Sequence, residues 1–267
     1  MRSLMSAPLL KILNLDVGYR IGRENKVVVG AINATLRAGE VVALIGMNGA
    51  GKSTLLRTLS AFQPPLSGKV EFAKGDIAGL SPAELAKCVS VVLTENSFAT
   101  LTMSELVSLG RTPYTGFLGR LTSEDKTVVA AAMERMGVAH LAGRVVTTLS
   151  DGERQKCLIA KAIAQQTPLM LLDEPTAFLD FRSKVQLFRT LRTLAADAGK
   201  AVVVSTHDIE MALRFAHKLW LICDGHLYEG SAQELAADGL LQRFIDGDGI
   251  AYDKENNRIE ITHEGAF

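Results

Sequence analysis

The segment Gly46–Thr54 reads GMNGAGKST and fits the spacing G-x-x-x-x-G-K-[ST] at every fixed position. Glycines let backbone N–H groups close on a phosphate, the Lys52 ammonium can reach the outer phosphate oxygens, and the Ser53 hydroxyl can ligate Mg²⁺. The alternative, a glycine turn with only a structural role, would not account for the lysine at this position. The residues that we predict to bind the nucleotide here are Gly46, Asn48, Gly49, Ala50, Gly51, Lys52, Ser53 and Thr54.

Two adjacent acids end the apolar stretch LMLLDEP at residues 169–175. Burying two carboxylates side by side is costly unless a cation or a proton lies beside them. We predict that Asp173 binds Mg²⁺ through water and that Glu174 orients and deprotonates an attacking water molecule. The alternative is an acid pair that caps the next turn.

Two further side chains end predicted strands. His207 follows the apolar run AVVVST, and ligands collect at the carboxyl ends of parallel strands. We therefore predict a role for His207 at the terminal phosphate, although a lone histidine is more often structural. Tyr19 ends the first strand-like stretch and could stack on a base or simply pack against its neighbours.

A second anion-binding pattern, TLSDGERQK, stands about a hundred residues after the glycine loop. Ser150 can cap a helix, and Gly152 leaves the backbone bare for an anion. One nucleotide does not need two phosphate sites far apart in one chain, and Asp151 adds a negative charge in the middle of the second.

Composition narrows the class of protein. The chain has 267 residues, 48% of them hydrophobic, and its 29 basic residues equal its 29 acidic ones. A balanced charge excludes an overall basic field that would favour nucleic acid, and the apolar runs are too short to span a bilayer. The start, MRSLMSAPLL, lacks the apolar region of a signal peptide. The three widely spaced cysteines, Cys88, Cys157 and Cys223, are expected to be buried in a reducing compartment, so we expect a cytosolic protein.

The elements that must position these residues alternate between strand and helix. Two strand-like stretches come first, at residues 9–19 and 26–36, and buried strands follow at 41–46, 169–173 and 201–205. A helical region from about residue 98 to 166 interrupts them, with helix starts predicted at Thr102 and Ser150, each followed by a Glu three residues later. We also predict a helix at 181–198 and a polar tip at residues 21–25 between the first two strands. We predict an α/β fold with a mainly parallel sheet, an antiparallel β subdomain and an inserted helical lobe. A hairpin at Asp224-Gly225 and a short peripheral strand pair near the end complete the prediction.

From about Leu10 to Gly230 the chain resembles the ATP-binding subunit of ABC transporters, with a P-loop NTPase core. These motifs and TAFLD (Thr176–Asp180) occur in the order and spacing of that family. The resemblance implies a head-to-tail homodimer around two ATP molecules with Mg²⁺, in which Ser150 and Gly152 of one chain cover the phosphate held by the other. It also places Asp180 across the dimer interface and Tyr19 on adenine. It assigns residues 8–245 to the ATPase domain, with the lobe at about 98–166, and 246–267 to a short C-terminal extension.

Two positions depart from the family pattern. The family usually has LSGGQ where this chain has LSDGE, and we hypothesise that Asp151 points away from the phosphate. The family also usually has glutamine where Glu95 stands, and that glutamine touches Mg²⁺ and the catalytic water. The resemblance therefore implies the same contacts for Glu95. The alternative for Glu95 is a surface loop acid.

The stretch LGRTPY within Val107–Asp125 resembles importers of iron–siderophore complexes, haem and vitamin B12. That branch implies transmembrane permease subunits, an indirect partnership with a substrate-binding protein, no nucleic acid, and a place on the cytoplasmic face of the inner or plasma membrane through the permease. The alternatives are an ABC ATPase of another transporter branch, a non-transport ABC ATPase, and another P-loop class such as a nucleotide switch or small-molecule kinase. One phosphate loop and no heptad run argue against the non-transport forms, and LSDGE argues against the other P-loop classes.

Overall fold

The computed structural model describes residues 7–72, 75–93, 100–116, 119–247 and 249–261. The strands are β1 (Leu10–Ile21), β2 (Glu24–Leu36), β3 (Val41–Gly46), β4 (Ser67–Phe72), β5 (Gly75–Asp76), β6 (Val89–Val92), β7 (Leu169–Asp173), β8 (Ala201–Ser205), β9 (Lys218–Cys223), β10 (His226–Gly230), β11 (Ile250–Asp253) and β12 (Arg258–Ile261). The helices are α1 (Lys52–Leu59), α2 (Pro82–Cys88), α3 (Met103–Ser108), α4 (Ser123–Arg135), α5 (Asp151–Ala164), α6 (Phe181–Ala198), α7 (Ile209–Phe215), α8 (Ala232–Ala237) and α9 (Leu240–Ile245).

The central sheet has the strand order β10-β9-β3-β8-β7-β6, and all neighbours are parallel except the β9–β10 hairpin. Successive side chains of a strand point to opposite faces, so a strand covered on both faces is apolar throughout. In β8, Val202 and Val204 pack in the cluster of α6 and the helical lobe, whereas Ala201 and Val203 pack in the cluster of α1 and the antiparallel strands. The continuous apolar runs in the sequence reflect this double burial.

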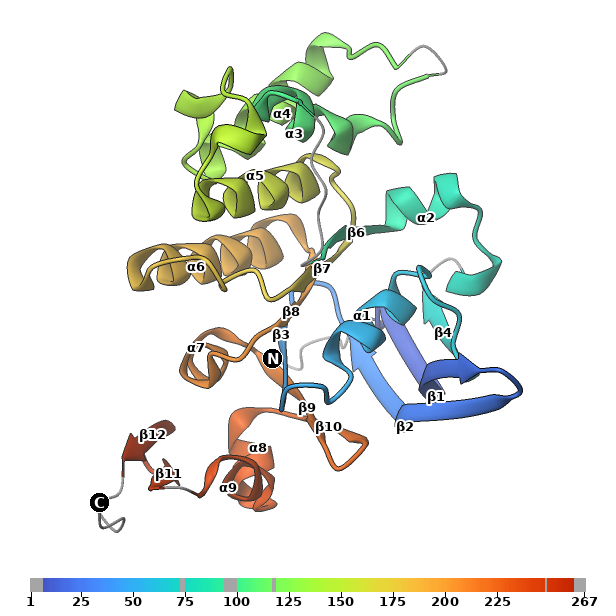
Figure 1. Cartoon of the computed structure of the whole chain (residues 1–267), viewed down its shortest axis with the longest axis vertical. Coiled ribbons are helices and arrows are strands. Elements are labelled where there is room, and N and C mark those ends of the chain that lie inside the picture. Colours follow the sequence, from blue (N-terminus) through green and yellow to red (C-terminus); the bar gives the residue numbers. More distant parts are fainter. Residues whose placement is uncertain (1–6, 73–74, 94–99, 117–118, 248, 262–267) are drawn as a thin grey trace.

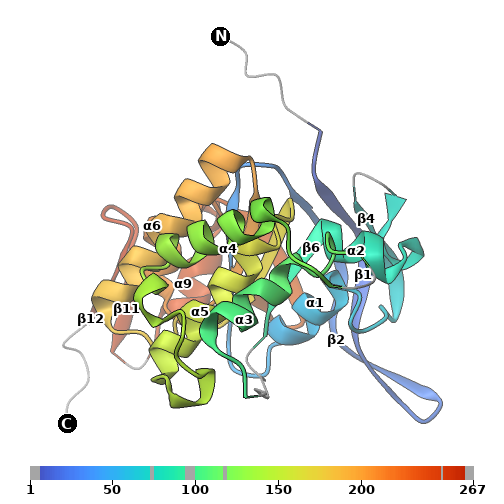
Figure 2. The same cartoon turned by 90° about the horizontal axis from the view of Figure 1, so that it is seen from above.

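A second sheet, with the order β2-β1-β4-β5, is antiparallel throughout. Helix α1 lies between this sheet and the central one, and α6 lies on the other side of the central sheet (Figure 1). Seen from above, β1 and β2 lie on the side of the molecule away from α6 (Figure 2). The nucleotide loop, which joins β3 to α1, is therefore next to both sheets.

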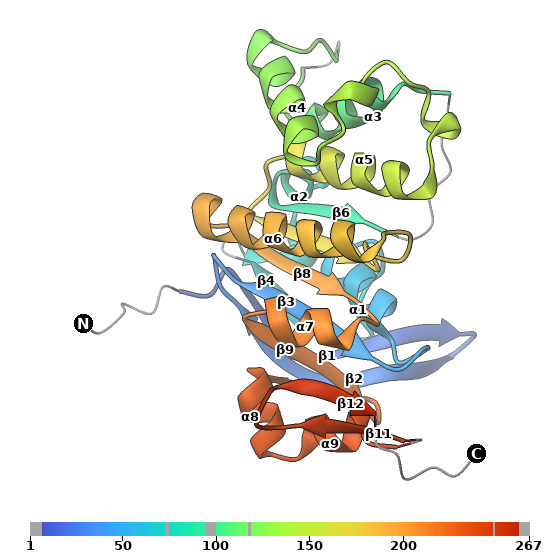
Figure 3. The same ribbon diagram turned by 90° about the vertical axis from the view of Figure 1, so that its left-hand side faces the viewer.

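The helical lobe, α3 to α5, lies at one end of the molecule, and α8, α9, β11 and β12 lie at the other (Figure 3). Helices α3, α4 and α5 each begin with a capping box, in which a Ser or Thr and an acidic residue three positions later bond to each other's backbone N–H. The starts predicted at Thr102 and Ser150 are confirmed.

The sequence located most elements correctly. The predicted strands at 169–173 and 201–205 and the predicted helix at 181–198 match β7, β8 and α6. The first hairpin differs from the prediction. Strand β1 continues to Ile21 and β2 begins at Glu24, so the turn between them has only two residues. Gly22 occupies the left-handed region there, with φ of +62°, so a tight turn replaces the longer tip that was predicted for residues 21–25.

Candidate functional site

Three strands of the central sheet end beside one another at the candidate site. Strands β3, β8 and β7 are adjacent and parallel, and they end at Gly46, Ser205 and Asp173. The cavity at this edge has a volume of about 570 Å³. Its lining residues are Tyr19, Lys26, Val27, Val28, Asn48, Gly49, Gly51, Lys52, Ser53, Thr54, Glu174 and His207.

The glycine loop has little freedom to change. Gly51 has φ of +104°, and a Cβ atom there would lie 2.8 Å from a methyl carbon of both Val28 and Val29. Gly46 ends β3 under similar crowding, since a Cβ atom would lie 2.9 Å from the Ile222 carbonyl oxygen. The loop glycines are thus required by the approach of neighbouring strands as well as by the backbone conformation.

The Lys52 ammonium folds back over the loop. Its Nζ donates to the carbonyl oxygens of Gly46 at 2.8 Å and Met47 at 3.2 Å. Burial lowers the pKa of Lys52, while Glu174 and Asp173 act in the opposite direction. This position suits a lysine that exchanges carbonyl oxygens for phosphate oxygens when a nucleotide enters.

A hydrogen-bonded chain fixes the two acids. Ser205 Oγ donates to Asp173 Oδ1 at 2.7 Å, and the Glu174 backbone N–H donates to Ser205 Oγ at 2.9 Å. Asp173 is buried beneath the loop, whereas the Glu174 side chain reaches the cavity. Glu174 has φ of +49°, a left-handed conformation that costs a non-glycine residue about 1 kcal/mol or more. The carboxylates of these two neighbours therefore lie in different places, that of Asp173 buried and that of Glu174 at the cavity.

The Glu174 carboxylate meets His207. Glu174 Oε1 lies 2.7 Å from His207 Nε2, and it has no other hydrogen-bond partner among the described residues. The contact is a hydrogen bond when Nε2 carries a proton. Burial raises the pKa of Glu174, and Asp173 raises it further, while His207 and Lys52 act against the rise. A carboxylate with a raised pKa is a stronger base when ionised, which suits a group that accepts a proton from water.

The β1–β2 hairpin forms the apolar wall of the cavity. Tyr19 pairs with Lys26 across the hairpin, and its hydroxyl lies 2.8 Å from Thr54 Oγ1. Tyr19 is 45% exposed and Val27 is 49% exposed, so both present apolar surface to the cavity. A flat apolar wall on the far side of the phosphate loop suits a base.

Nine of the predicted residues line the cavity: Tyr19, Asn48, Gly49, Gly51, Lys52, Ser53, Thr54, Glu174 and His207. Gly46 and Ala50 lie in the loop itself, and Asp173 lies behind it. Ser150, Gly152 and Asp180 are not among the lining residues, and Glu95 falls outside the described residues.

Sequence reasoning missed four contributors: Ser205, which joins the two acids, and Lys26, Val27 and Val28 of β2. Ser205 carried a signal, because it is the polar end of an apolar strand. The β2 residues did not, since only the hairpin register brings them to the cavity.

The second anion-binding pattern forms the start of α5. Ser150 Oγ donates to Glu153 Oε2 at 2.8 Å and accepts the Glu153 backbone N–H at 3.3 Å. Asp151 Oδ1 lies 3.3 Å from Nη1 of Arg154, in its own helical turn. The extra negative charge of Asp151 is therefore partly offset within α5 itself.

Asp180 also begins a helix rather than lining the cavity. Its Oδ1 accepts the Ser183 backbone N–H at 2.7 Å, which caps α6 and lowers the pKa of Asp180. A Cβ atom on Gly152 would lie 3.1 Å from the Phe178 carbonyl oxygen. The start of α5 and the segment before α6 are thus in close contact.

The described residues contain no group of three or more His, Cys, Asp or Glu side chains that could hold a metal ion. Mg²⁺ bound with ATP, however, is usually held by one or two protein oxygens plus phosphates and water. The Ser53 hydroxyl in the cavity and the Asp173 carboxylate behind it are oxygen donors of that kind.

Comparison with known proteins places these features in a family. Residues 29–177 match the family described as ABC transporter. The chain is 44% identical to an uncharacterized ABC transporter ATP-binding protein of Methanocaldococcus jannaschii, over 80% of this chain and 73% of that protein. It is 40% identical to the hemin import ATP-binding protein HmuV of Streptomyces coelicolor, over 88% and 84%. It is 35% identical to the cobalamin import ATP-binding protein BtuD of Halobacterium salinarum, over 94% of this chain but only 63% of that longer protein.

Solved structures of ABC transporter cassettes are also similar to this chain. A dimeric bacterial ABC transporter cassette matches with a TM-score of 0.75 and 28% identity, over 83% of this chain and 98% of that chain. A post-hydrolysis dimer bound to ADP and Pi matches with a TM-score of 0.74, 28% identity and the same coverage. Within the described residues, every helix is too short or too polar to cross a membrane.

Proposed function

This chain belongs to the ABC transporter family and is an ATPase, and we propose that it powers import of an iron–siderophore, haem or cobalamin type of substrate through partner permease subunits. The observation that carries the catalytic part is the meeting of Lys52, Glu174 and His207 in one cavity at the ends of adjacent parallel strands. The relatives named for hemin and cobalamin import support the substrate class. Residues 8–245 form the proposed ATPase domain.

In the proposed reaction, Glu174 accepts a proton from water as that water attacks the terminal phosphorus of ATP. The new P–O bond forms as the bond to the leaving oxygen breaks, which releases ADP and phosphate. Lys52 stabilises the negative charge on the phosphate oxygens. The short contact between Glu174 and His207 supports His207 as the group that orients the base and faces the terminal phosphate.

We propose that Mg²⁺ accompanies ATP, held by the Ser53 hydroxyl and, through water, by Asp173. The ion would neutralise part of the phosphate charge. Ser205 fixes the Asp173 carboxylate in place through its 2.7 Å hydrogen bond. Glu95, the third predicted metal contact, stays a prediction.

We propose a head-to-tail homodimer in which Ser150 and Gly152 of one chain cover the ATP held by the other, with Asp180 at the interface. This arrangement explains why an anion-binding helix start is absent from the lining of the chain's own described cavity. The dimeric cassettes among the structural relatives support it. The permease would hold the dimer at the cytoplasmic face of the membrane, and a substrate-binding protein would deliver the cargo to the permease.

Transport in cells tests this proposal. A strain that lacks this chain is supplied with the unaltered protein or with Lys52→Ala, and uptake of a labelled ferric siderophore, haem and cobalamin is measured separately. We expect uptake of one of the three to be restored by the unaltered protein and not by Lys52→Ala. A strain whose uptake of all three is normal without this chain would refute the substrate class. Purification of the chain with ribosomes or DNA instead of a permease would favour a non-transport ATPase.

A further inference from the structure

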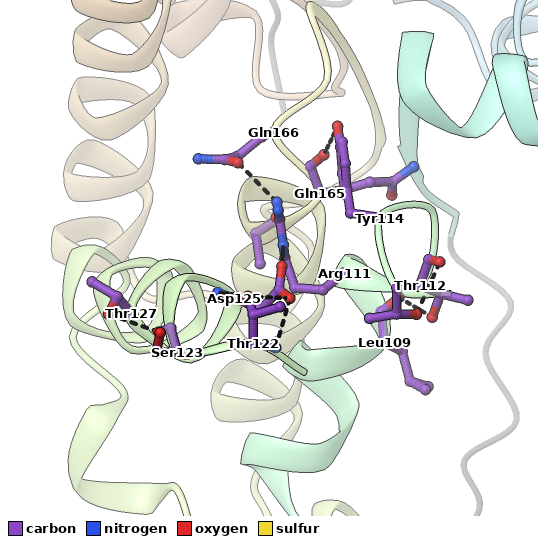
Figure 4. A network of polar contacts seen from close by, with 12 residues as sticks. Leu109, Arg111, Thr112, Tyr114, Thr122, Ser123, Asp125, Thr127, Gln165 and Gln166 are labelled. Atoms are coloured by element: carbon purple, nitrogen blue, oxygen red, sulfur yellow. Dashed lines mark hydrogen bonds and ion pairs between the residues drawn. The ribbon is translucent and has the colours of Figure 1, made fainter. Parts of the chain in front are cut away.

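The carboxyl end of α5 is held by a polar network centred on the buried side chain of Arg111 (Figure 4). Arg111 is 5% exposed. Its Nη1 donates to the Ala164 carbonyl oxygen at 2.9 Å and to Gln166 Oε1 at 2.8 Å, and its Nε donates to Asp125 Oδ1 at 2.9 Å. One planar guanidinium therefore joins the end of α5 to the start of α4 and to the residues that lead into β7.

Asp125 completes the pair from the α4 side. Its second oxygen, Oδ2, accepts the Thr122 backbone N–H at 2.9 Å and the Thr122 hydroxyl at 2.8 Å. These bonds, together with the one from Arg111, lower the pKa of Asp125 to about 2. The carboxylate is thus ionised at any physiological pH, and both charges of the pair have hydrogen-bond partners.

Tyr114 and Gln165 extend the network into the nucleotide-binding core. The Tyr114 ring lies over Arg111, with 4.1 Å from Cζ to the ring centroid, and its hydroxyl donates to the Gln165 carbonyl oxygen at 2.9 Å. Gln165 Nε2 donates to the carbonyl oxygens of Ala86 at 2.7 Å and Val89 at 3.1 Å. The network therefore links the lobe to α2 and β6.

Gly110 allows this close approach. A Cβ atom there would lie 2.4 Å from the Lys161 carbonyl oxygen and 3.2 Å from the Gln165 nitrogen. The segment that carries Arg111 thus lies directly on the last turn of α5, where a side chain would push the two apart.

We propose that Arg111 is a positioning residue that holds α5 at the angle at which its Ser150 end meets the nucleotide bound by a second copy of this chain. The 14 residues of α5 form a rod about 21 Å long. A tilt of about 10° at the Arg111 end would move the Ser150 end by about 4 Å, far beyond the tolerance of a hydrogen bond. This role rests on the proposed ATP-bound dimer, and the Ser150 end makes no contact with Arg111 itself.

Arg111→Lys is the informative change, because it keeps a positive charge beside Asp125 but removes the planar fork that reaches three acceptors. Met133→Ala is the matched control, since it removes buried side-chain volume from the same lobe and leaves the network intact. Both are made in a Glu174→Gln background, in which we expect ATP to bind and to be hydrolysed much more slowly. ATP affinity, melting temperature and ATP-driven self-association by analytical ultracentrifugation are measured for each.

We expect Arg111→Lys to bind ATP as the background does but to self-associate about tenfold more weakly or worse. Met133→Ala should lower the melting temperature at least as much and leave self-association unchanged. Equal weakening by both variants would show that the network only stabilises the lobe, and unchanged association in Arg111→Lys would overturn the proposal.

A second measurement does not depend on dimerisation. Spin labels on Asp151→Cys and Arg189→Cys, in a chain that carries Cys223→Ser, report the distance between the start of α5 and the exposed face of α6. The distance distribution should broaden or shift in Arg111→Lys and stay as in the parent in Met133→Ala. If the background protein fails to self-associate with ATP, the proposed dimer fails, and this distribution alone decides whether Arg111 sets the angle of α5.

Discussion

The substitution Glu174→Gln separates the contribution of the carboxylate to the catalytic rate from its effect on the free energy of unfolding. The substitution keeps the size of the side chain and its ability to bond to His207, but the amide cannot accept a proton from water. A general base usually contributes a factor of about 10² to 10⁴ to the rate. That range corresponds to about 3–5 kcal/mol of activation free energy. We expect kcat to fall by that factor while ATP binding is kept.

The same substitution should stabilise the nucleotide-free protein. Burial raises the pKa of Glu174, so the folded state holds this proton more tightly than the unfolded chain does. The stabilisation that comes with the raised pKa is present at low pH and is lost as the pH rises from about 4.3, the ordinary value for glutamate, through the folded-state pKa. Glutamine does not ionise, so its advantage over Glu174 should grow across that interval and then stay constant.

Steady-state ATPase rates and urea unfolding between pH 4 and 8 check both halves. Glu210→Gln is the control, because Glu210 is an exposed acid outside the described cavity lining. It should change neither quantity. Turnover of Glu174→Gln within a few-fold of the unaltered protein would refute the general-base role. A stability difference that did not vary with pH would refute the argument from burial.

Three further changes test other parts of the structure. Gly51→Ala should cost about 1–3 kcal/mol in unfolding free energy and abolish ATP binding measured by fluorescence, because the loop would need to leave its φ of +104°. His217→Asn should flatten the pH dependence of urea unfolding. His217 Nδ1 accepts the Val41 N–H and burial lowers the His217 pKa, so the unaltered protein should lose stability as pH falls below about 6.5. Asp151→Gly should change ATP-driven self-association less than about fivefold, since Arg154 already offsets the charge and exposed pairs contribute about 1 kcal/mol or less.

Two of these changes have a matched variant, and for the third a contrary outcome is defined. Gly49→Ala introduces strain at φ of +77° but meets no atom within 4 Å, so it should be milder than Gly51→Ala. His226→Asn replaces another exposed histidine, one that does not accept the Val41 N–H, and it should keep the pH dependence that His217→Asn removes. A large gain in association in Asp151→Gly would show that this acid opposes dimer closure.

The candidate site could be predicted where chemistry coincides with the end of an apolar strand. Gly46 and Asp173 end such runs and His207 closely follows one, and the carboxyl ends of parallel strands meet at one edge of a sheet. Ser205 and Val28 escaped prediction for different reasons. The role of Ser205 depends on a hydrogen bond across adjacent strands, and that of Val28 depends on a hairpin register that the sequence did not fix.

The fold was most predictable where local signals set the boundary, as at the capping boxes of Thr102 and Ser150. It was least predictable where distant segments share a buried polar contact. Arg111 stood out in the sequence only as part of a resemblance, since its partners Asp125 and Gln166 come from different elements. The role of a buried charged residue such as Arg111 can be assigned only when the positions of all its hydrogen-bond acceptors are known.

The LGRTPY segment can be divided into replaceable and fixed positions. Gly110 and Arg111 face inward and set the architecture of the lobe, whereas Leu109 is 51% exposed and Thr112 is also exposed. The side chains at the two outer positions can therefore be exchanged without disturbing the buried contacts of the lobe, whereas those of the inner pair cannot. Similarity to a relative at the inner pair then reports a shared lobe architecture, whereas the outer positions can vary independently of that architecture.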